Sequence, residues 1–291
     1  MKSLFLFLLP GVIIAPTVLA QPVLRLPEAS PAASVGQTIG VTDVRIDYHR
    51  PAVNQRKVWG GLVQNNVLWR AGANENTTIS FSTPVKVEGL DLAAGTYGLY
   101  MIPNTPQWTV VFSRFSGGWG TYNYDPGEDA GRVKVTPQSA EPQERLSYQF
   151  EDQTNNAATV SLRWEKLKVN FRIQVDLVTT VRASIRSELR GGKHWSSDAW
   201  ATAARWENRN GDPALALEYA NHALEAGQTF NALRTKAAIL EKRGDAKGAA
   251  ELREQAKALA TESELMSIAA SALMGAKKHD EAIAYLNGYL T

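Results

Sequence analysis

Alternating apolar and polar residues indicate β-strands in the first part of the chain. Residues 44–49 alternate between the two kinds of side chain, and residues 167–176 repeat the pattern over a longer run. A period of two places one set of side chains on each face of a strand. Short runs rich in β-branched and aromatic residues lie at 77–82, 95–101, 108–112, 132–135, 145–150 and 159–164. Many short, half-buried strands predict a sandwich or barrel with mostly antiparallel pairing.

The pattern becomes helical from residue 178 onward, and it contains a repeat. Asp212, Asp245 and Asp280 each stand between one helical stretch and the next, and they are 33 and 35 residues apart. Alanine recurs at matching positions after them, at Ala216, Ala223, Ala249, Ala256 and Ala284. This spacing resembles the tetratricopeptide repeat, a helix-turn-helix unit of about 34 residues. The alternative is an ordinary small helical bundle.

Together these patterns predict an α+β chain of two domains. An antiparallel β-sandwich over residues 34–178 is followed by an all-α, tetratricopeptide-repeat-like helical array over residues 179–291. The array is expected to offer a groove to a protein partner, because stacked helix pairs form extended concave surfaces. Residues 21–33 contain three prolines and are expected to form an extended lead-in.

The first twenty residues have the layout of a secretory signal peptide. Lys2 precedes a short apolar run over residues 4–14, and Val18-Leu19-Ala20 stands before the expected cut, after Ala20. The apolar run is shorter than the roughly 20 residues that a membrane span needs, and no later segment is long enough. We therefore expect a periplasmic or secreted protein with no membrane span after cleavage; an uncleaved anchor is the alternative.

The composition and charge of the chain exclude some kinds of chemistry and disfavour one class of partner. The chain has no cysteine, so disulfides, thiolate catalysis and a lipidated export signal are excluded. Its formal net charge is +2, and the lysines and arginines are spread along the sequence rather than grouped. Nucleic-acid binding favours a concentrated basic face, so nucleic acid is not an expected partner.

The common catalytic and cofactor signatures are absent from the sequence. It has no His-Glu-x-x-His, no Gly-x-Ser-x-Gly, no Ser-x-x-Lys and no phosphate-binding Gly-Lys loop, and its four histidines are scattered. We therefore expect no bound cofactor and no metal site. His49 is the histidine best placed for a catalytic triad, although its position in the strand pattern favours a simple exposed residue. Absent signatures favour a non-catalytic protein without deciding the point.

Residues 48–78 form the first candidate site. Three arginines, whose planar forks suit carboxylate or phosphate, stand among aromatic and carboxamide side chains. The candidate ligand-binding residues are Tyr48, Arg50, Arg56, Trp69, Arg70 and Asn74. Together they predict a pocket for a small anionic or polar ligand, or for a peptide. Alternatively, Arg50 and Arg70 pair with Asp43, Asp47 or Glu75 and pin a long loop to the sandwich, with the tryptophans in the core.

The glycine-rich loop 115–131 is the second candidate. Trp119, Tyr122 and Tyr124 are predicted to form a stacking platform for a sugar or a peptide, or else to cover the end of the sandwich. The acidic residues 125, 128 and 129 are hard oxygen ligands of the kind that calcium prefers, but their spacing does not match the twelve-residue calcium loop.

Several motifs resemble a known family. They are Tyr48-x-Arg50-Pro51, Arg56-x-x-Trp59-Gly60-Gly61-Leu62-Val63, Trp69-Arg70-x-Gly72-Ala73-Asn74, Ala94-Gly95-Thr96-Tyr97 and Trp108-Thr109-Val110-Val111-Phe112. In this order they resemble the bacterial domain-of-unknown-function family 2911, over about residues 30–176. The resemblance extends to the helical tail, which members of that family also tend to carry. The resemblance implies an exported bacterial protein and supplies no catalytic residues.

The sequence leaves two main functions open, beside a third in which the helices are a docking module and the sandwich is only its carrier. The first is a non-catalytic envelope protein that binds a small ligand or a peptide through the β-sandwich and a protein partner through the helices. The second is a periplasmic hydrolase with an unfamiliar site, using His49 or the Asp125 and Glu128 carboxylates.

Overall fold

The computed structural model describes residues 26–287. The predicted signal peptide and its cleavage point after Ala20 therefore lie outside the described residues. Within the described range no helix is both long and apolar enough to cross a bilayer.

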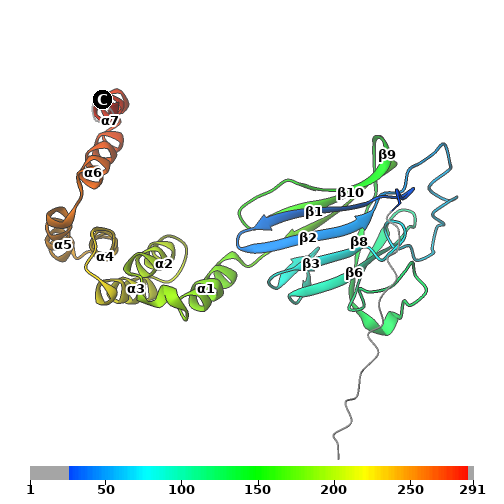
Figure 1. The fold of residues 1–291 in the computed structure, drawn as a ribbon, viewed down its shortest axis with the longest axis horizontal. Helices are drawn as coiled ribbons and strands as arrows, with labels where there is room; N and C mark the ends of the chain where they lie inside the picture. Colours follow the sequence, from blue (N-terminus) through cyan, green and yellow to red (C-terminus); the bar gives the residue numbers. More distant parts are fainter. Residues whose placement is uncertain (1–25, 288–291) are drawn as a thin grey trace, which may run out of the picture.

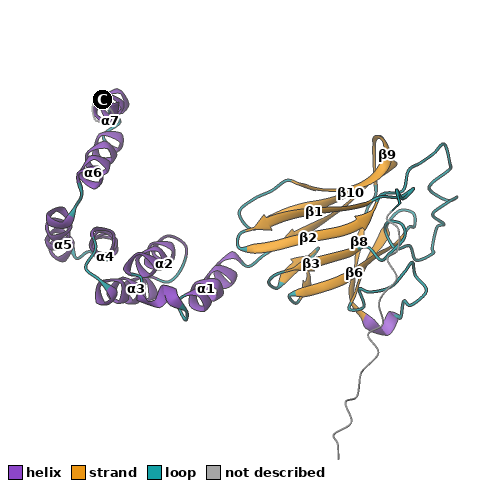
Figure 2. Ribbon diagram, viewed as in Figure 1, coloured by secondary structure: helices purple, strands orange, loops and turns teal. Residues whose placement is uncertain are grey.

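Two antiparallel sheets pack face to face in the first part of the chain, as predicted (Figures 1 and 2). One sheet has six strands, in the order β1 (Ala32–Ile39), β2 (Thr42–His49), β3 (Thr78–Phe81), β6 (Gly95–Ile102), β7 (Trp108–Ser113) and β8 (Asp129–Val135). The other has four strands, in the order β5 (Leu90–Leu92), β4 (Val85–Val87), β10 (Ala157–Gln174) and β9 (Gln138–Glu151).

One hydrophobic core joins the inner faces of the two sheets. Along β2 the side chains of Val44, Ile46 and Tyr48 are buried, as their alternation predicts. Phe112 of β7 meets Phe171 of β10 edge to face across the core, with ring centroids 6.0 Å apart. Such aromatic contacts between sheets supply much of the buried area that holds a sandwich together.

The sequence prediction was wrong about the strands at 159–164 and 167–175, which form one continuous strand, β10. The strand bends where Glu165 adopts φ 52°, and its register against β9 shifts on either side of that residue. An extra residue in a strand produces such a β-bulge. The bulge interrupts the alternation of apolar and polar residues, so the sequence pattern predicts two strands. Strands β1, β4 and β5 were not predicted, because β1 is an edge strand of small and polar residues and the other two have three residues each.

Within the described residues seven α-helices follow, and most of them pack in pairs. They are α1 (Leu177–Glu188), α2 (Ser197–Asn210), α3 (Pro213–Ala226), α4 (Phe230–Lys242), α5 (Ala246–Leu259), α6 (Glu262–Gly275) and α7 (His279–Asn287). The pairs are α2 with α3, α4 with α5, and α6 with α7. Asp212 and Asp245 cap the N-termini of α3 and α5, as their spacing in the sequence predicts.

Small residues let the paired helices approach closely. Ala216, Ala223, Ala249 and Ala256 are at most 1% exposed. Ala284 was expected to share this role, but it is exposed on α7, whereas Ala282 is buried. Among the described residues α7 is the last helix and packs mainly on α6, so only one of its faces is covered.

A buried ion pair ties α1, which follows the sandwich directly, to the first helix pair. The Arg182 guanidinium donates two hydrogen bonds of 2.8 Å to the Glu207 carboxylate, which is fully buried. These bonds lower the pKa of Glu207 despite its burial, and they raise the pKa of Arg182.

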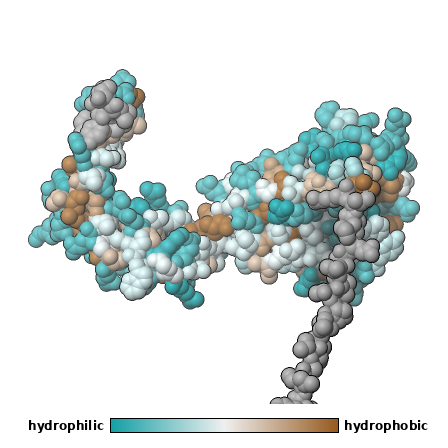
Figure 3. All heavy atoms as spheres, in the orientation of Figure 1, coloured by the Kyte–Doolittle hydropathy of each residue, from teal (hydrophilic) through white to brown (hydrophobic). Residues whose placement is uncertain are grey.

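Hydrophobic residues gather over α1 on the visible surface (Figure 3).

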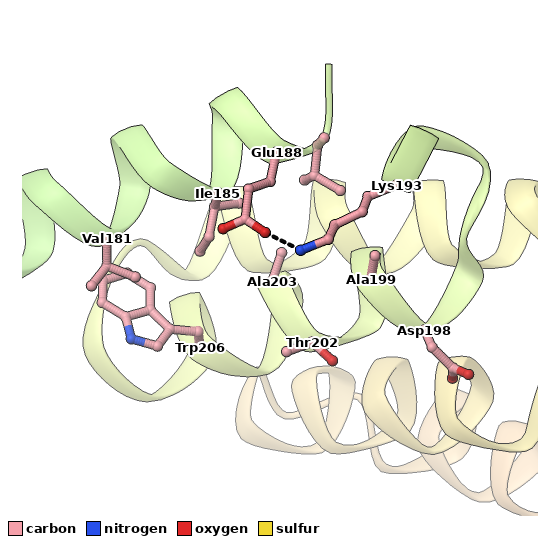
Figure 4. A pocket seen from close by; sticks show the side chains of 10 residues that line it. Val181, Ile185, Glu188, Lys193, Asp198, Ala199, Thr202, Ala203 and Trp206 are labelled. Carbon is pink, nitrogen blue, oxygen red and sulfur yellow. Dashed lines mark hydrogen bonds and ion pairs between the residues drawn. The ribbon is translucent and has the colours of Figure 1, made fainter. Parts of the chain in front are cut away.

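Helices α1 and α2 leave a hollow of about 480 Å³ between them (Figure 4). Val181, Ile185, Ala203 and Trp206 line it, and an ion pair joins Glu188 of α1 to Lys193 of the short helix η2 (Gly192–Trp195) beside it. Beside the hollow, Ile185 and Leu189 pack into the apolar cluster of the first helix pair, so α1 meets this pair through both apolar and polar contacts.

Candidate functional site

The two candidate stretches, which are separate in the sequence, meet on the outer face of the six-stranded sheet. Glu75 and Trp119 form a β-bridge, and the backbone N–H of Asn76 donates to Gly118 O at 3.0 Å. The backbone N–H of Gly120 donates to Asn74 O at 3.2 Å. These bonds hold the loop after β7 against the chain that leads into β3.

The loop after β7 also covers part of this outer face. Tyr100, Val111 and Ser113 point away from the sandwich core, yet each is at most 1% exposed. The Tyr124 ring meets the Tyr100 ring edge to face, with centroids 5.2 Å apart. The Asn76 carboxamide is buried in the same layer, and burial raises the pKa of Tyr100. The site therefore rests on a second, smaller packed layer.

Arg70 differs from Arg50 and Arg56 because its guanidinium has neither a carboxylate nor a backbone carbonyl as a hydrogen-bond partner among the described residues. Its Cζ lies 5.2 Å from the centroid of the Trp119 ring, and its Nε is buried without a hydrogen-bond partner. In the described part of the chain it forms no ion pair. Burial lowers the pKa of Arg70, and the neighbouring Tyr122 and Glu75 oppose that shift. A partly buried cation of this kind is stabilised by an added anion.

Trp119 and Tyr122 form an exposed stacked pair beside Arg70. Their ring centroids are 5.9 Å apart and the planes are 10° from parallel. Trp119 is 52% exposed and Tyr122 is 83% exposed, so flat apolar surface faces solvent. The third predicted aromatic, Tyr124, does not join them; its hydroxyl donates to Asp129 at 3.0 Å and accepts from Arg132 at 2.8 Å. Two residues of the predicted platform therefore lie together.

Gly120 allows Arg70 and the aromatic pair to lie so close. Its φ is +65°, and a Cβ at this position would lie 2.9 Å from the Arg70 Nη1 atom and 3.5 Å from the Tyr122 ring. Only glycine adopts this conformation without strain while leaving that space open. Gly120 was not among the site residues predicted from the sequence, although its place between Trp119 and Tyr122 was a signal.

Most of the other predicted site residues hold the long loop in place. Arg50 Nε donates to Leu146 O at 2.9 Å, and Arg56 donates to Ala52 O at 2.6 Å. Asn74 adopts φ 55° and donates to the Glu28 carboxylate at 3.0 Å. The loop-pinning interpretation from sequence named Arg50 and Arg70, and of these two Arg50 does tie the loop to the sandwich, through Leu146. The bonds of the two arginines go to backbone carbonyls and not to Asp43, Asp47 or Glu75.

Tyr48 and Trp69 belong to the core side of the site. The Tyr48 ring packs edge to face on Tyr148, with centroids 4.8 Å apart. Trp69 stacks on Trp164 with centroids 5.9 Å apart, and its Nε1 donates to Gly72 O at 3.1 Å. These residues position the corner that carries Arg70, and most of their ring surface packs against the core.

His49 lies at the end of β2 between two carboxylates. Its Nε2 is 3.2 Å from a Glu75 oxygen and 3.5 Å from a Glu28 oxygen. A shallow hollow of about 410 Å³ adjoins it, lined also by Asp47 and Asn76. In a catalytic triad the imidazole needs a hydroxyl on one nitrogen and a carboxylate on the other. Here both carboxylates meet the same nitrogen.

Two of the three acidic residues of the loop, Asp125 and Asp129, form hydrogen bonds within the chain. Asp125 Oδ1 accepts from the Gly127 N–H at 2.8 Å and caps the short helix η1 (Pro126–Glu128). Asp129 accepts from Tyr124 and from Arg132, which raises the pKa of both groups, although burial is the larger cause for Tyr124. These bonds order the loop that carries Trp119.

The family relationship can now be set beside this geometry. Residues 30–173 match the family described as protein of unknown function (DUF2911). This part of the chain is a DUF2911 domain. The match confirms the resemblance drawn from the motifs, and it leaves the helical part without a family assignment. No curated protein and no solved structure matches the chain. Arg70, Trp119 and Tyr122 all lie within the DUF2911 domain.

Proposed function

We propose that the DUF2911 domain binds a small ring-bearing acid on the surface formed by Arg70, Trp119 and Tyr122, which we call the Arg70 platform. The observation that carries this proposal is the partly buried Arg70 without a carboxylate partner beside an exposed, stacked aromatic pair. The cation supplies a fork for a carboxylate, and the rings supply a flat face for a sugar or an aromatic ring.

The expected affinity is modest. Ring stacking contributes about 0.5–1.5 kcal/mol and a charge-assisted hydrogen bond about 1.5–3 kcal/mol. Together they correspond to a Kd of roughly millimolar order for a single ring, since 1 mM is about 4 kcal/mol. A ligand that extends along the loop gains further contacts.

Binding without catalysis is the function that this geometry supports best. The predicted hydrolase would need His49 to activate a nucleophile, but its Nε2 meets both Glu75 and Glu28. Of the carboxylate pair that was the other catalytic candidate, Asp125 caps helix η1 and Glu128 lies within that helix. We further propose that the protein works in the periplasm or outside the cell, on the signal-like pattern of its first twenty residues.

A ligand-observed NMR screen of the purified chain tests the proposal. The probes are sugar acids and aromatic carboxylates, each beside its neutral counterpart. The Trp119→Ala variant should lose the saturation-transfer signal of the acids. Trp195→Ala is the matched control, because Trp195 is 80% exposed on helix η2, outside the DUF2911 domain. Equal signals from the wild type and the Trp119→Ala variant would refute the platform.

A further inference from the structure

Three arginines meet in a groove between α2 and α4, outside the DUF2911 domain. Arg205 and Arg209 of α2 and Arg234 of α4 line a hollow of about 310 Å³ together with Asn208 and Asn231. On each helix these residues are three or four positions apart, so they share one face. Helices α2 and α4 are the first members of neighbouring pairs and pack side by side (Figure 1). We call this hollow the arginine groove.

The charges in the arginine groove are not neutralised by the chain itself. Arg205 donates to the hydroxyls of Thr202 at 2.9 Å and Thr235 at 3.1 Å, which fixes its orientation without supplying negative charge. Arg234 lies over the Phe230 ring, 5.2 Å from its centroid. Within residues 26–287, Arg205, Arg209 and Arg234 form no ion pair with a carboxylate.

The rest of the groove adds hydrogen-bonding groups and one more cation. The carboxamide of Asn231 donates to Asp198 at 3.2 Å, and its oxygen remains an acceptor. Lys242 donates to the backbone carbonyl of Asn208 at 2.6 Å, which places an ammonium group beside the hollow. Carboxamides both donate and accept, so they match the N–H and C=O groups of a peptide backbone.

We propose that the arginine groove binds an acidic segment of a partner protein. Carboxylates of the segment would engage Arg209 and Arg234, and the two asparagines would hold its backbone. The hollow is at the lower end of the range for ligand sites, about 300–1,000 Å³, so it takes a few side chains. Nucleic acid needs a longer basic face, and the 31 basic and 29 acidic residues of this chain are interspersed.

Fluorescence anisotropy on the full chain tests this inference. The probe is a labelled octapeptide of Asp and Glu, beside its Asn and Gln counterpart and a single-stranded DNA octamer. The groove variant is Arg209→Gln with Arg234→Gln, and both positions are exposed, so folding is preserved. The matched control is Arg186→Gln with Arg190→Gln, two exposed arginines of the α1 region. It removes the same charge outside the groove.

The acidic peptide should bind the wild type and the control variant with affinities within about twofold of each other. The groove variant should bind at least about tenfold more weakly, the effect of losing one charge-assisted hydrogen bond. Equal weakening in both variants, no binding of the acidic peptide, or tighter binding of the DNA with the same dependence on the groove would overturn the proposal.

Discussion

The guanidinium of Arg70 lies over the indole ring of Trp119, with Cζ 5.2 Å from the ring centroid. The contact joins the corner before β3 to the loop after β7, and the stacked Tyr122 extends it to the solvent. Cation–π attraction compensates only part of the cost of burying a guanidinium. Trp119 therefore holds the Arg70 guanidinium in place, and the guanidinium can still bind an anion.

Replacing Arg70 and replacing Arg50 should have different effects on stability. Arg70→Gln removes a partly buried charge without a carboxylate partner, so the free energy of unfolding should change by less than about 0.5 kcal/mol. Arg50→Gln removes the bond to the Leu146 carbonyl and should cost about 1.5 kcal/mol. Urea denaturation measures both values. A large loss for Arg70→Gln would mean that Arg70 serves the fold.

Gly120→Ala should weaken ligand binding more than Gly117→Ala does. At Gly120 the new methyl group meets the Arg70 guanidinium, and φ +65° strains an alanine by about 1 kcal/mol. At Gly117, in the same loop, a Cβ meets nothing within 4 Å. The measurement is the affinity for an acidic ring probe in each variant. Similar affinities in the two variants would show that Gly120 does not set the position of Arg70.

The sequence predicted the sheets well and the site only in pieces. Alternation identified β2 and the inner face of β10, because burial on one side imposes a period of two. It did not join Arg70 to Trp119, since their contact depends on the path of two loops over the outer face of a sheet. Arg50, Arg56 and Arg70 look alike in the sequence. Which of them carries free hydrogen-bonding capacity depends on the carbonyls that the fold brings near.

Tyr148→Phe should destabilise the β domain by about 1–2 kcal/mol. The buried hydroxyl donates to Ala71 O at 2.8 Å, and Ala71 adopts φ 51°, a strained conformation that this bond helps to hold. Thermal unfolding measures the loss, and Tyr122→Phe, at an exposed ring, is the control with no expected change. If Tyr148→Phe and the wild type melted at the same temperature, this role of the hydroxyl would be contradicted.

Tyr148 should also make the stability of the β domain depend on pH in the alkaline range. Burial raises the pKa of Tyr148 well above its ordinary value. Above about pH 10 the unfolded chain releases this proton while the folded chain keeps it, so stability falls as the pH rises further. Tyr148→Phe should show a shallower loss of stability between about pH 10 and 11. Identical slopes in the two proteins would exclude Tyr148 as a cause.

Glu207 should make the stability of the helical part depend on pH in the acidic range. The Arg182 hydrogen bonds lower the pKa of Glu207, so its contribution to stability is present above the ordinary glutamate value of about 4.3. That contribution is lost as the pH falls through the lowered pKa. Glu207→Gln should lower the melting temperature at pH 7 by about 5 °C and flatten its dependence on acid. Glu254→Gln, at the exposed ion pair with Lys257 on α5, should change neither quantity.

Selectivity for an acid over its neutral counterpart is the most direct test of the Arg70 platform. Isothermal titration compares galacturonate with galactose, and benzoate with benzyl alcohol, on the wild type and on Arg70→Gln. At least one acid should bind the wild type about tenfold tighter than its neutral counterpart, and that ratio should fall to about one in Arg70→Gln. An acid preference that persists unchanged in Arg70→Gln would contradict the account.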